Sequence, residues 1–409
     1  MTYAPASRPM VGVRDGSRLV VQTWLITRLL LVGVALWVGK TTGRSASDML
    51  ANWDVQHYFD IAKNGYAADN DIAFFPGWPL VLRAVASLGV PMLWAGVGIA
   101  VICSALAAAA LYRLGGPIAA VVWLLAPTTV FTMVPYTEAP FCAAAFWAWE
   151  RARAGRWGAA AGLAALACTL RVSGLFLLGA LMILALFPAV QRPEISPSPW
   201  PGPSAWPAPQ ASGWPPPQDP ALARGWLRDR RLRALAWLSI PALTMFAYVF
   251  YLYRLTGDWN AWYRAQSTGW PRGFTWPWVA LQHTIEAATS TAYPAFPEWS
   301  WVFRAELAAM AVGVIVTLIC LRKRRWAEAA WVGIQVLAFS CSYWYLSVNR
   351  AVLLWFPLFI LIGERLSGGW NVSPGRRRVR MLVTAAAMAV AAYVLCWWGW
   401  LFFTGRWAS

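Results

Sequence analysis

The sequence predicts an all-α protein that crosses a membrane many times. Hydrophobic residues make up 59% of the 409 residues and charged residues only 12%, whereas ordinary globular chains have about 45–50% and about 25%. The apolar residues also gather in runs, the first of which is about 20 residues long, enough to span a bilayer. So few charges cannot cover a water-exposed surface, so the composition excludes a soluble globular protein.

The first apolar run extends from Leu19 to Val38 and follows several arginines. It is longer than the core of a signal peptide and does not end at small residues before a cleavage site, so we expect an uncleaved first span. Further runs follow at about 92–112, 117–134, 139–150, 157–170, 173–190, 234–255, 305–321, 327–346, 350–363 and 381–403. We therefore expect about eleven spans. The shorter runs can also be half-helices, which a membrane tolerates where protein buries them.

The basic residues set the expected orientation. Lys and Arg number 34 against 17 Asp and Glu, a net charge of +17 that by itself suggests a nucleic-acid partner. More than half of these cations lie in the N-terminal tail and at 151–156, 224–233, 322–325 and 376–380. With eleven spans, all of these clusters fall on the side of the N-terminus, which the positive-inside rule makes cytoplasmic. The charge is then mainly a topology signal, and no nucleic acid is needed to explain it.

These signals divide the chain into four parts. We expect a cytoplasmic tail (1–18), an N-terminal transmembrane module (19–190) with an outer loop at 40–90, a cytoplasmic loop (191–233), and a C-terminal module (234–409) with an outer loop at 256–301. Residues 191–220 contain eleven prolines, which predicts a disordered spacer or a segment that recruits a polyproline-binding partner. The six cysteines lack metal-site spacing, and we expect buried thiols.

The remaining polar residues gather in the outer connections. Segment 54–62 is helix-compatible, and Asp54, His57 and Tyr58 lie on one face of that helix. The other outer connections contain Glu138, Arg171, Asp258, Gln266 and Arg350. Ionisable groups at or near membrane depth are costly and indicate a functional site.

The motifs in these connections resemble the bacterial branch of the PIG-V mannosyltransferase family. The specific motif is Trp53-Asp54-x-x-His57-Tyr58, followed by Asn64-Gly65-Tyr66 and Phe74-Phe75-Pro76. Weaker motifs follow in the family's order: Tyr136-Thr137-Glu138, Arg171-Val172-Ser173-Gly174, Gly257-Asp258 with Gln266 and Trp270-x-Arg272, and Ser347-x-x-Arg350. The chain departs from the family at Thr137, where Ser is common, at Ala351, where Tyr is common, and in its Pro-rich insert.

The resemblance implies a GT-C glycosyltransferase of a bacterial plasma membrane, with its active site on the outer face. The donor would be a polyprenyl-phosphate sugar, with mannose expected, and the acceptor a glycolipid. A phosphodiester oxygen leaves as a stabilised anion, so such an enzyme needs one base and cations for the phosphate. A glycosidase instead needs a pair of carboxyl groups. We expect no obligatory metal or cofactor.

Asp54 is the expected general base; the alternative is a helix-capping aspartate. His57 can bind donor phosphate or orient the base, and Tyr58 shares its helix face. Arg171 and Arg350 are candidates to clamp phosphate through their guanidinium forks, or they are residues that snorkel at span ends.

Glu138 can hold a sugar hydroxyl or pair with one of the two arginines. Asp258 and Gln266 are weaker candidates of the same kind.

Three further features have ordinary explanations. Arg28 lies inside the first span and is expected to neutralise a buried acid. Asp69-Asn70-Asp71 has the form of a metal-binding DxD motif, but we expect a solvated turn. Five tryptophans can stack on sugar rings, although an interfacial belt explains most of them: Trp270, Trp276, Trp278, Trp299 and Trp301.

Other functions remain open. A flippase or transporter of lipid-linked sugars usually shows internal repeats, and the sequence shows none. A scaffold would depend on the Pro-rich loop. A GT-C enzyme that uses another polyprenyl-phosphate hexose fits the residues equally well, and the sequence does not identify the acceptor.

Overall fold

The computed structural model describes residues 13–187, 220–270, 272–367 and 374–408. In these ranges the chain forms α-helices and short 3-10 helices, and its single β-bridge joins Phe274 to Ser342. The all-α prediction is confirmed. The Pro-rich stretch before residue 220 and the start of the N-terminal tail lie outside the described residues.

Five of the described helices are long and apolar enough to cross a membrane. They are α1 (Val13–Thr42), α5 (Met92–Leu124), α9 (Pro220–Thr256), α12 (Pro297–Arg322) and α16 (Pro374–Phe403). Three shorter apolar helices accompany them: α4 (Gly77–Ala86), α7 (Trp157–Leu170) and α8 (Ser173–Leu186). The prediction of a membrane protein with several spans is confirmed, whereas the predicted count of eleven spans is not.

The expected span at 117–134 is wrong in its length. Its helix continues α5 across a kink and ends at Leu124, and a separate 3-10 turn, η2, covers Thr129–Thr132. Gly116 has a φ of +80° at the kink, a conformation that glycine adopts without steric cost. Pro117 follows and has no N–H to donate, so the helix bends there.

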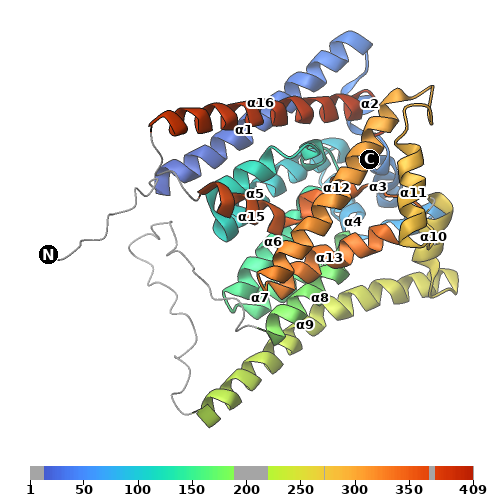
Figure 1. The fold of residues 1–409 in the computed structure, drawn as a ribbon. Coiled ribbons are helices and arrows are strands. Elements are labelled where there is room, and N and C mark those ends of the chain that lie inside the picture. Colours follow the sequence, from blue (N-terminus) through green and yellow to red (C-terminus); the bar gives the residue numbers. More distant parts are fainter. Residues whose placement is uncertain (1–12, 188–219, 271, 368–373, 409) are drawn as a thin grey trace.

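The centre of the molecule is α6 (Glu138–Arg153), in which almost every side chain is buried. Helix α6 packs against α5 and α7, and α15 (Phe356–Ser367) packs against α5 (Figure 1). The rings of Trp149 and Phe356 lie 4.9 Å apart in this core. Helix α6, which with 16 residues is too short to cross a bilayer, is therefore surrounded by protein, as the half-helix alternative requires.

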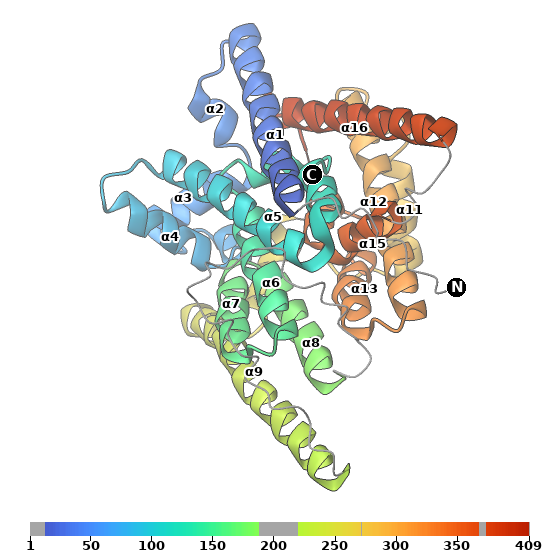
Figure 2. The ribbon, with the colours of Figure 1, turned by 90° about the vertical axis from the view of Figure 1, so that its left-hand side faces the viewer.

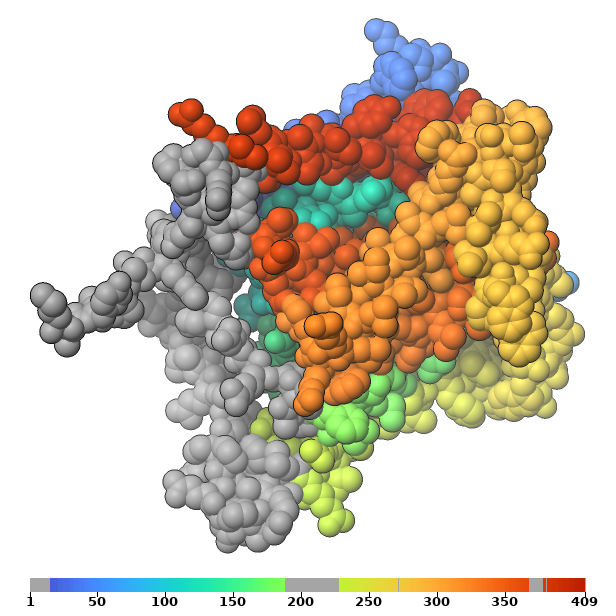
Figure 3. All heavy atoms as spheres, viewed as in Figure 1, coloured from blue at the N-terminus to red at the C-terminus, as the bar shows by residue number. Residues whose placement is uncertain are grey.

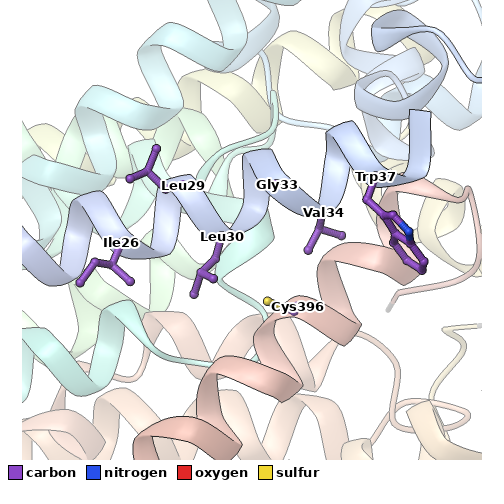
Figure 4. A pocket seen from close by; sticks show the side chains of 7 residues that line it. All are labelled: Ile26, Leu29, Leu30, Gly33, Val34, Trp37 and Cys396. Carbon is purple, nitrogen blue, oxygen red and sulfur yellow. The ribbon is translucent and has the colours of Figure 1, made fainter. Parts of the chain in front are cut away.

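Helices α1 and α16 contact each other at one side of the bundle and cross at an angle (Figures 1 and 2). Leu29 and Leu36 of α1 remain 68% and 69% exposed, as expected for side chains that face lipid. An apolar groove of about 480 Å³ lies between the two helices. Figure 4 shows the side chains that line it. No charged side chain lines this groove, so acid–base chemistry has to be located elsewhere.

Two connections between the long helices position the candidate site. The first connection (residues 43–91) contains α2 (Ala46–Leu50), α3 (Asp54–Asn64), η1 (Asp69–Ala73) and α4. The second connection (residues 257–296) contains α10 (Ala261–Gly269) and α11 (Pro277–Ala287) and lies on one side of the molecule, yellow in Figure 3. Helix α10 packs on η1 and joins the two connections.

A third polar element follows α13 (Trp326–Ser340): the short helix α14 (Val348–Ala351), which continues into the 3-10 turn η4 (Val352–Leu354).

Candidate functional site

A cavity of about 130 Å³ lies where the two connections meet α14 and the turns before α6 and α8. Its polar lining consists of Asp54, Tyr58, Thr137, Arg171, Gln266, Arg272 and Arg350. Aromatic rings complete it, among them Phe74, Trp262 and Trp270. The structure therefore gathers one carboxylate and three guanidinium groups around one small space.

Asp54 and Arg350 form an ion pair across this cavity. The Nη1 of Arg350 donates to Oδ2 of Asp54 at 2.8 Å, although the residues are 296 positions apart. Trp53 occupies the cap position of α3, so the interpretation of Asp54 as a helix cap is wrong. Trp53 and Ser347, which directly precede α3 and α14, have φ values of +57° and +67°. Non-glycine residues in such conformations carry strain, which often occurs at functional sites.

Glu138 stands behind the cavity and holds two arginines. Its side chain is fully buried, and Oε1 accepts a hydrogen bond of 2.7 Å from Nη1 of Arg171. The same oxygen lies 3.7 Å from Nε of Arg350. Glu138 is not among the residues that line the cavity, so its pairing with the arginines, one of the two expected roles, is what the structure shows.

Arg350 is fixed on several sides. Burial lowers its pKa, but the carboxylates of Asp54 and Glu138 outweigh this effect and raise the pKa above the ordinary value. Its guanidinium also lies over the rings of Phe131 and Tyr136, at 5.2 and 5.3 Å, where cation–π attraction adds to the ion pairs. Arg350 is only 8% exposed, so the snorkelling interpretation is wrong for this residue.

The polar face of α3 is divided between two environments. Tyr58 lines the cavity, and burial raises the pKa of its phenol. His57 instead places Nδ1 3.0 Å from Oδ1 of Asp71 and stacks on Phe74. The expectation that three side chains share one target is therefore wrong for His57. Asp71 is 4% exposed, which also contradicts the expected solvated turn.

The second connection contributes Gln266 but not Asp258. Gln266 lines the cavity and its Nε2 donates to the backbone oxygen of Ala73 at 3.1 Å. Asp258 forms an ion pair with the exposed Arg264 and is absent from the cavity lining. Of the five tryptophans considered, Trp270 lines the cavity.

Comparison with known proteins finds similarity in the N-terminal part of the chain. Residues 26–190 match the family model described as mannosyltransferase (PIG-V). Over this segment the chain is similar to the PIG-V mannosyltransferase family. The segment contains Asp54, Glu138 and Arg171, whereas Gln266, Arg272 and Arg350 lie outside it.

Curated relatives of the PIG-V segment are similar to it over a limited length. Over 152 residues, the chain is 34% identical to GPI alpha-1,6-mannosyltransferase 2 of Mus musculus and 33% identical to that of Homo sapiens. Each of these alignments covers 32% of this chain and 31% of the relative. It is 30% identical over 129 residues to GPI mannosyltransferase 2 of Drosophila pseudoobscura pseudoobscura, over 27% of the chain and 28% of the relative. The chain thus spans about a third of these relatives. No solved structure matches it.

Two residues beyond the PIG-V segment belong to the site although the sequence assigned them no role. Arg272 occurs in a quoted motif and lines the cavity. Glu306 of α12 is fully buried and accepts hydrogen bonds of 3.0 Å from the backbone N–H groups of Ser347 and Asn349. An acidic residue inside the apolar run 305–321 is a signal that could have identified Glu306.

Arg28 in α1 of the PIG-V segment does not neutralise an acid, so that expectation is wrong. Its Nη1 donates to the backbone and hydroxyl oxygens of Thr132, at 3.1 and 2.8 Å. The residues that the structure describes include no group of three or more His, Cys, Asp or Glu side chains suited to a metal ion.

Proposed function

We propose that the chain is a membrane mannosyltransferase that transfers mannose from polyprenyl-phosphate-mannose to a glycolipid. The observation that carries this proposal is the cavity, in which the carboxylate of Asp54 faces a group of arginines. The family of the N-terminal segment and the names of its relatives support mannose as the sugar. The apolar helices support a membrane-bound lipid donor and acceptor.

In the proposed reaction, Asp54 accepts the proton of the acceptor hydroxyl. The hydroxyl oxygen then forms a bond to the anomeric carbon of mannose, and the bond from that carbon to the phosphate oxygen breaks. The electron pair leaves with the polyprenyl phosphate, and the anomeric configuration inverts. Because the phosphate is already a good leaving group, one base is enough. Glu138 lies behind Arg171 and Arg350 and acts on the reaction by positioning them.

The location of the reaction is part of the proposal. The basic clusters at the start of α1, α9 and α16 and at the end of α12 support a cytoplasmic N-terminus by the positive-inside rule. The connections that form the cavity would then lie on the outer face of a bacterial plasma membrane, and the acceptor would be an outer-leaflet glycolipid. Neither a metal nor another cofactor takes part in the proposed step.

Reconstituted protein tests the proposal directly. Purified chain in liposomes receives radiolabelled polyprenyl-phosphate-mannose and a total lipid extract, and the products are analysed by mass. We expect label in a glycolipid that is heavier than its acceptor by one hexose. Label that only crosses the bilayer would favour a flippase, and transfer from polyprenyl-phosphate-glucose alone would identify another hexose. Absence of transfer from every donor would overturn the proposal.

A further inference from the structure

The three guanidinium groups around the cavity are not equally paired. Three guanidinium groups line it, and two carboxylates lie within ion-pair distance of them. Arg171 pairs with Glu138 and Arg350 pairs with Asp54. Within the described part of the chain, Arg272 has no carboxylate within 4.0 Å. With both pairs formed, Arg272 is the guanidinium of the cavity lining that has no ion-pair partner among the described residues, and the buried carboxylate of Glu306 acts on it only from a greater distance.

Arg272 is held beside another cation. Its Nη2 donates to the hydroxyl of Ser347 at 3.2 Å, and Nη2 of Arg350 donates to the same hydroxyl at 3.3 Å. Two like charges therefore share one neutral oxygen, an arrangement that repulsion disfavours in a partly buried site. The Nε of Arg272 is buried and has no hydrogen-bond partner in the described structure. A buried donor without a partner costs free energy, so the site is suited to an anion.

Backbone contacts of the segment that follows Arg272 fix the position of this residue. Thr275 N–H donates to the backbone oxygen of Cys341 at 3.0 Å, and Phe274 forms the β-bridge to Ser342. These contacts tie the segment after Arg272 to the turn that leads into α14. Burial and the nearby Arg350 lower the pKa of Arg272 to about 10, so its guanidinium is charged at neutral pH and ready to bind an anion.

We propose that Arg272 is the residue that binds the phosphate of the lipid-linked sugar donor. This inference rests on the proposed function, in which the donor is a phosphodiester with one negative charge. A planar guanidinium with free N–H groups matches phosphate oxygens. Arg171 and Arg350 are already paired with Glu138 and Asp54, so Arg272 is the guanidinium left to bind the phosphate. The phosphate balances the charge of Arg272.

The test compares Arg272→Gln and Arg272→Lys with the wild type. An exposed arginine of α4 outside the cavity lining provides the matched control, Arg83→Gln. Two quantities are measured: binding of radiolabelled polyprenyl monophosphate to the full chain in detergent, and the KM values for donor and acceptor. We expect Arg272→Gln to weaken phosphate binding and to raise the donor KM, each about 10- to 100-fold, with an unchanged acceptor KM. Arg272→Lys should lie between, and Arg83→Gln should match the wild type.

The outcomes separate this inference from the proposed function. Wild-type phosphate binding by Arg272→Gln overturns the inference, even where transfer is observed. Binding that depends on Arg272 without transfer from any donor upholds the anion site and overturns the proposed reaction. Polyprenol, which lacks the phosphate, should bind wild type and variant alike. If Arg272→Gln does not insert into the membrane, Arg272→Lys provides the test, because lysine keeps the positive charge and lacks the guanidinium fork. An unchanged donor KM in Arg272→Lys then overturns the inference.

Discussion

Asp54 gains its environment from residues far away in the chain. Its carboxylate is bound by Arg350, and Arg350 is held in turn by Glu138 and by two aromatic rings. A carboxylate in such a pair is held in a fixed position, as a base must be before it accepts a proton. The acceptor hydroxyl then has one defined place to bind, on the open side of the cavity.

Replacement of Asp54 tests its role as the base. Asp54→Asn keeps an oxygen that can accept the hydrogen bond of Arg350 but removes the proton acceptor. We expect transfer to fall by at least about 100-fold, while the protein still inserts and elutes as the wild type does. Transfer kinetics and size-exclusion chromatography measure the two effects. Asp60→Asn, on the exposed face of the same helix, should retain activity; full activity in Asp54→Asn would remove Asp54 from the mechanism.

At the scale of the element, α14 and the corner between α7 and α8 determine where two arginines point. Helix α14 has four residues, too few to be stable alone, and Glu306 of α12 binds the N–H groups at its start. The α7–α8 corner brings Arg171 to Glu138. Gly174, at the start of α8, packs against the backbone of Cys168 in α7. Both elements depend on contacts that a single substitution can remove.

Glu306→Gln should loosen α14. The amide offers one oxygen and one NH2 group, so one of the two buried N–H donors is left without an acceptor, at a cost of about 1–3 kcal/mol. We expect a lower melting temperature and a reduced kcat, because Arg350 loses its fixed position. Thermal unfolding in detergent and transfer kinetics measure these changes. Glu364→Gln, a half-exposed residue paired with Lys323, should have a much smaller effect.

Gly174→Ala should displace the α7–α8 corner. A Cβ at this position would lie 2.5 Å from Cα of Cys168 and 2.7 Å from its N, both backbone atoms. We expect a loss of about 1–3 kcal/mol in stability and weaker activity, since the corner carries Arg171. At Gly179 of the same helix a Cβ meets no heavy atom within 4 Å, so Gly179→Ala should be neutral or stabilising. Equal behaviour of the two variants in thermal unfolding would contradict the steric argument.

At the scale of the whole molecule, the cavity joins the two halves of the chain. Asp54 and Arg171 come from the segment that matches the PIG-V family, while Arg272 and Arg350 come from the remainder. The chemistry of the site thus depends on both halves, and the composition of the stretch between them indicates a spacer.

Deletion of residues 193–218 should leave transfer intact. The deleted stretch ends before α9 begins at Pro220, and loss of a spacer changes loop-closure entropy only slightly. We expect kcat and KM within about twofold of the wild type for a purified deletion variant, given that a twofold change corresponds to only about 0.4 kcal/mol. Loss of function in cells with retained transfer in vitro would instead indicate that the loop recruits a partner.

The sequence by itself determined the class of the protein and its local structure. The apolar runs predict membrane helices because length and hydropathy are local properties, and the polar spacing in residues 54–62 predicts α3 for the same reason. It also brought Asp54, Tyr58, Glu138, Arg171, Gln266 and Arg350 into one list, and the structure places all six in or directly behind one cavity.

Only the tertiary structure decided which charges meet. His57 turns to Asp71, Asp258 pairs with Arg264, and Arg350 reaches Asp54 across 296 positions. The partner of a charge depends on distances between elements that the sequence does not state, because the energy of an ion pair falls with separation and with exposure to water. For the same reason the sequence did not show that Arg272 has no ion-pair partner in the described part of the chain, and this unpaired guanidinium is what points to a bound phosphate.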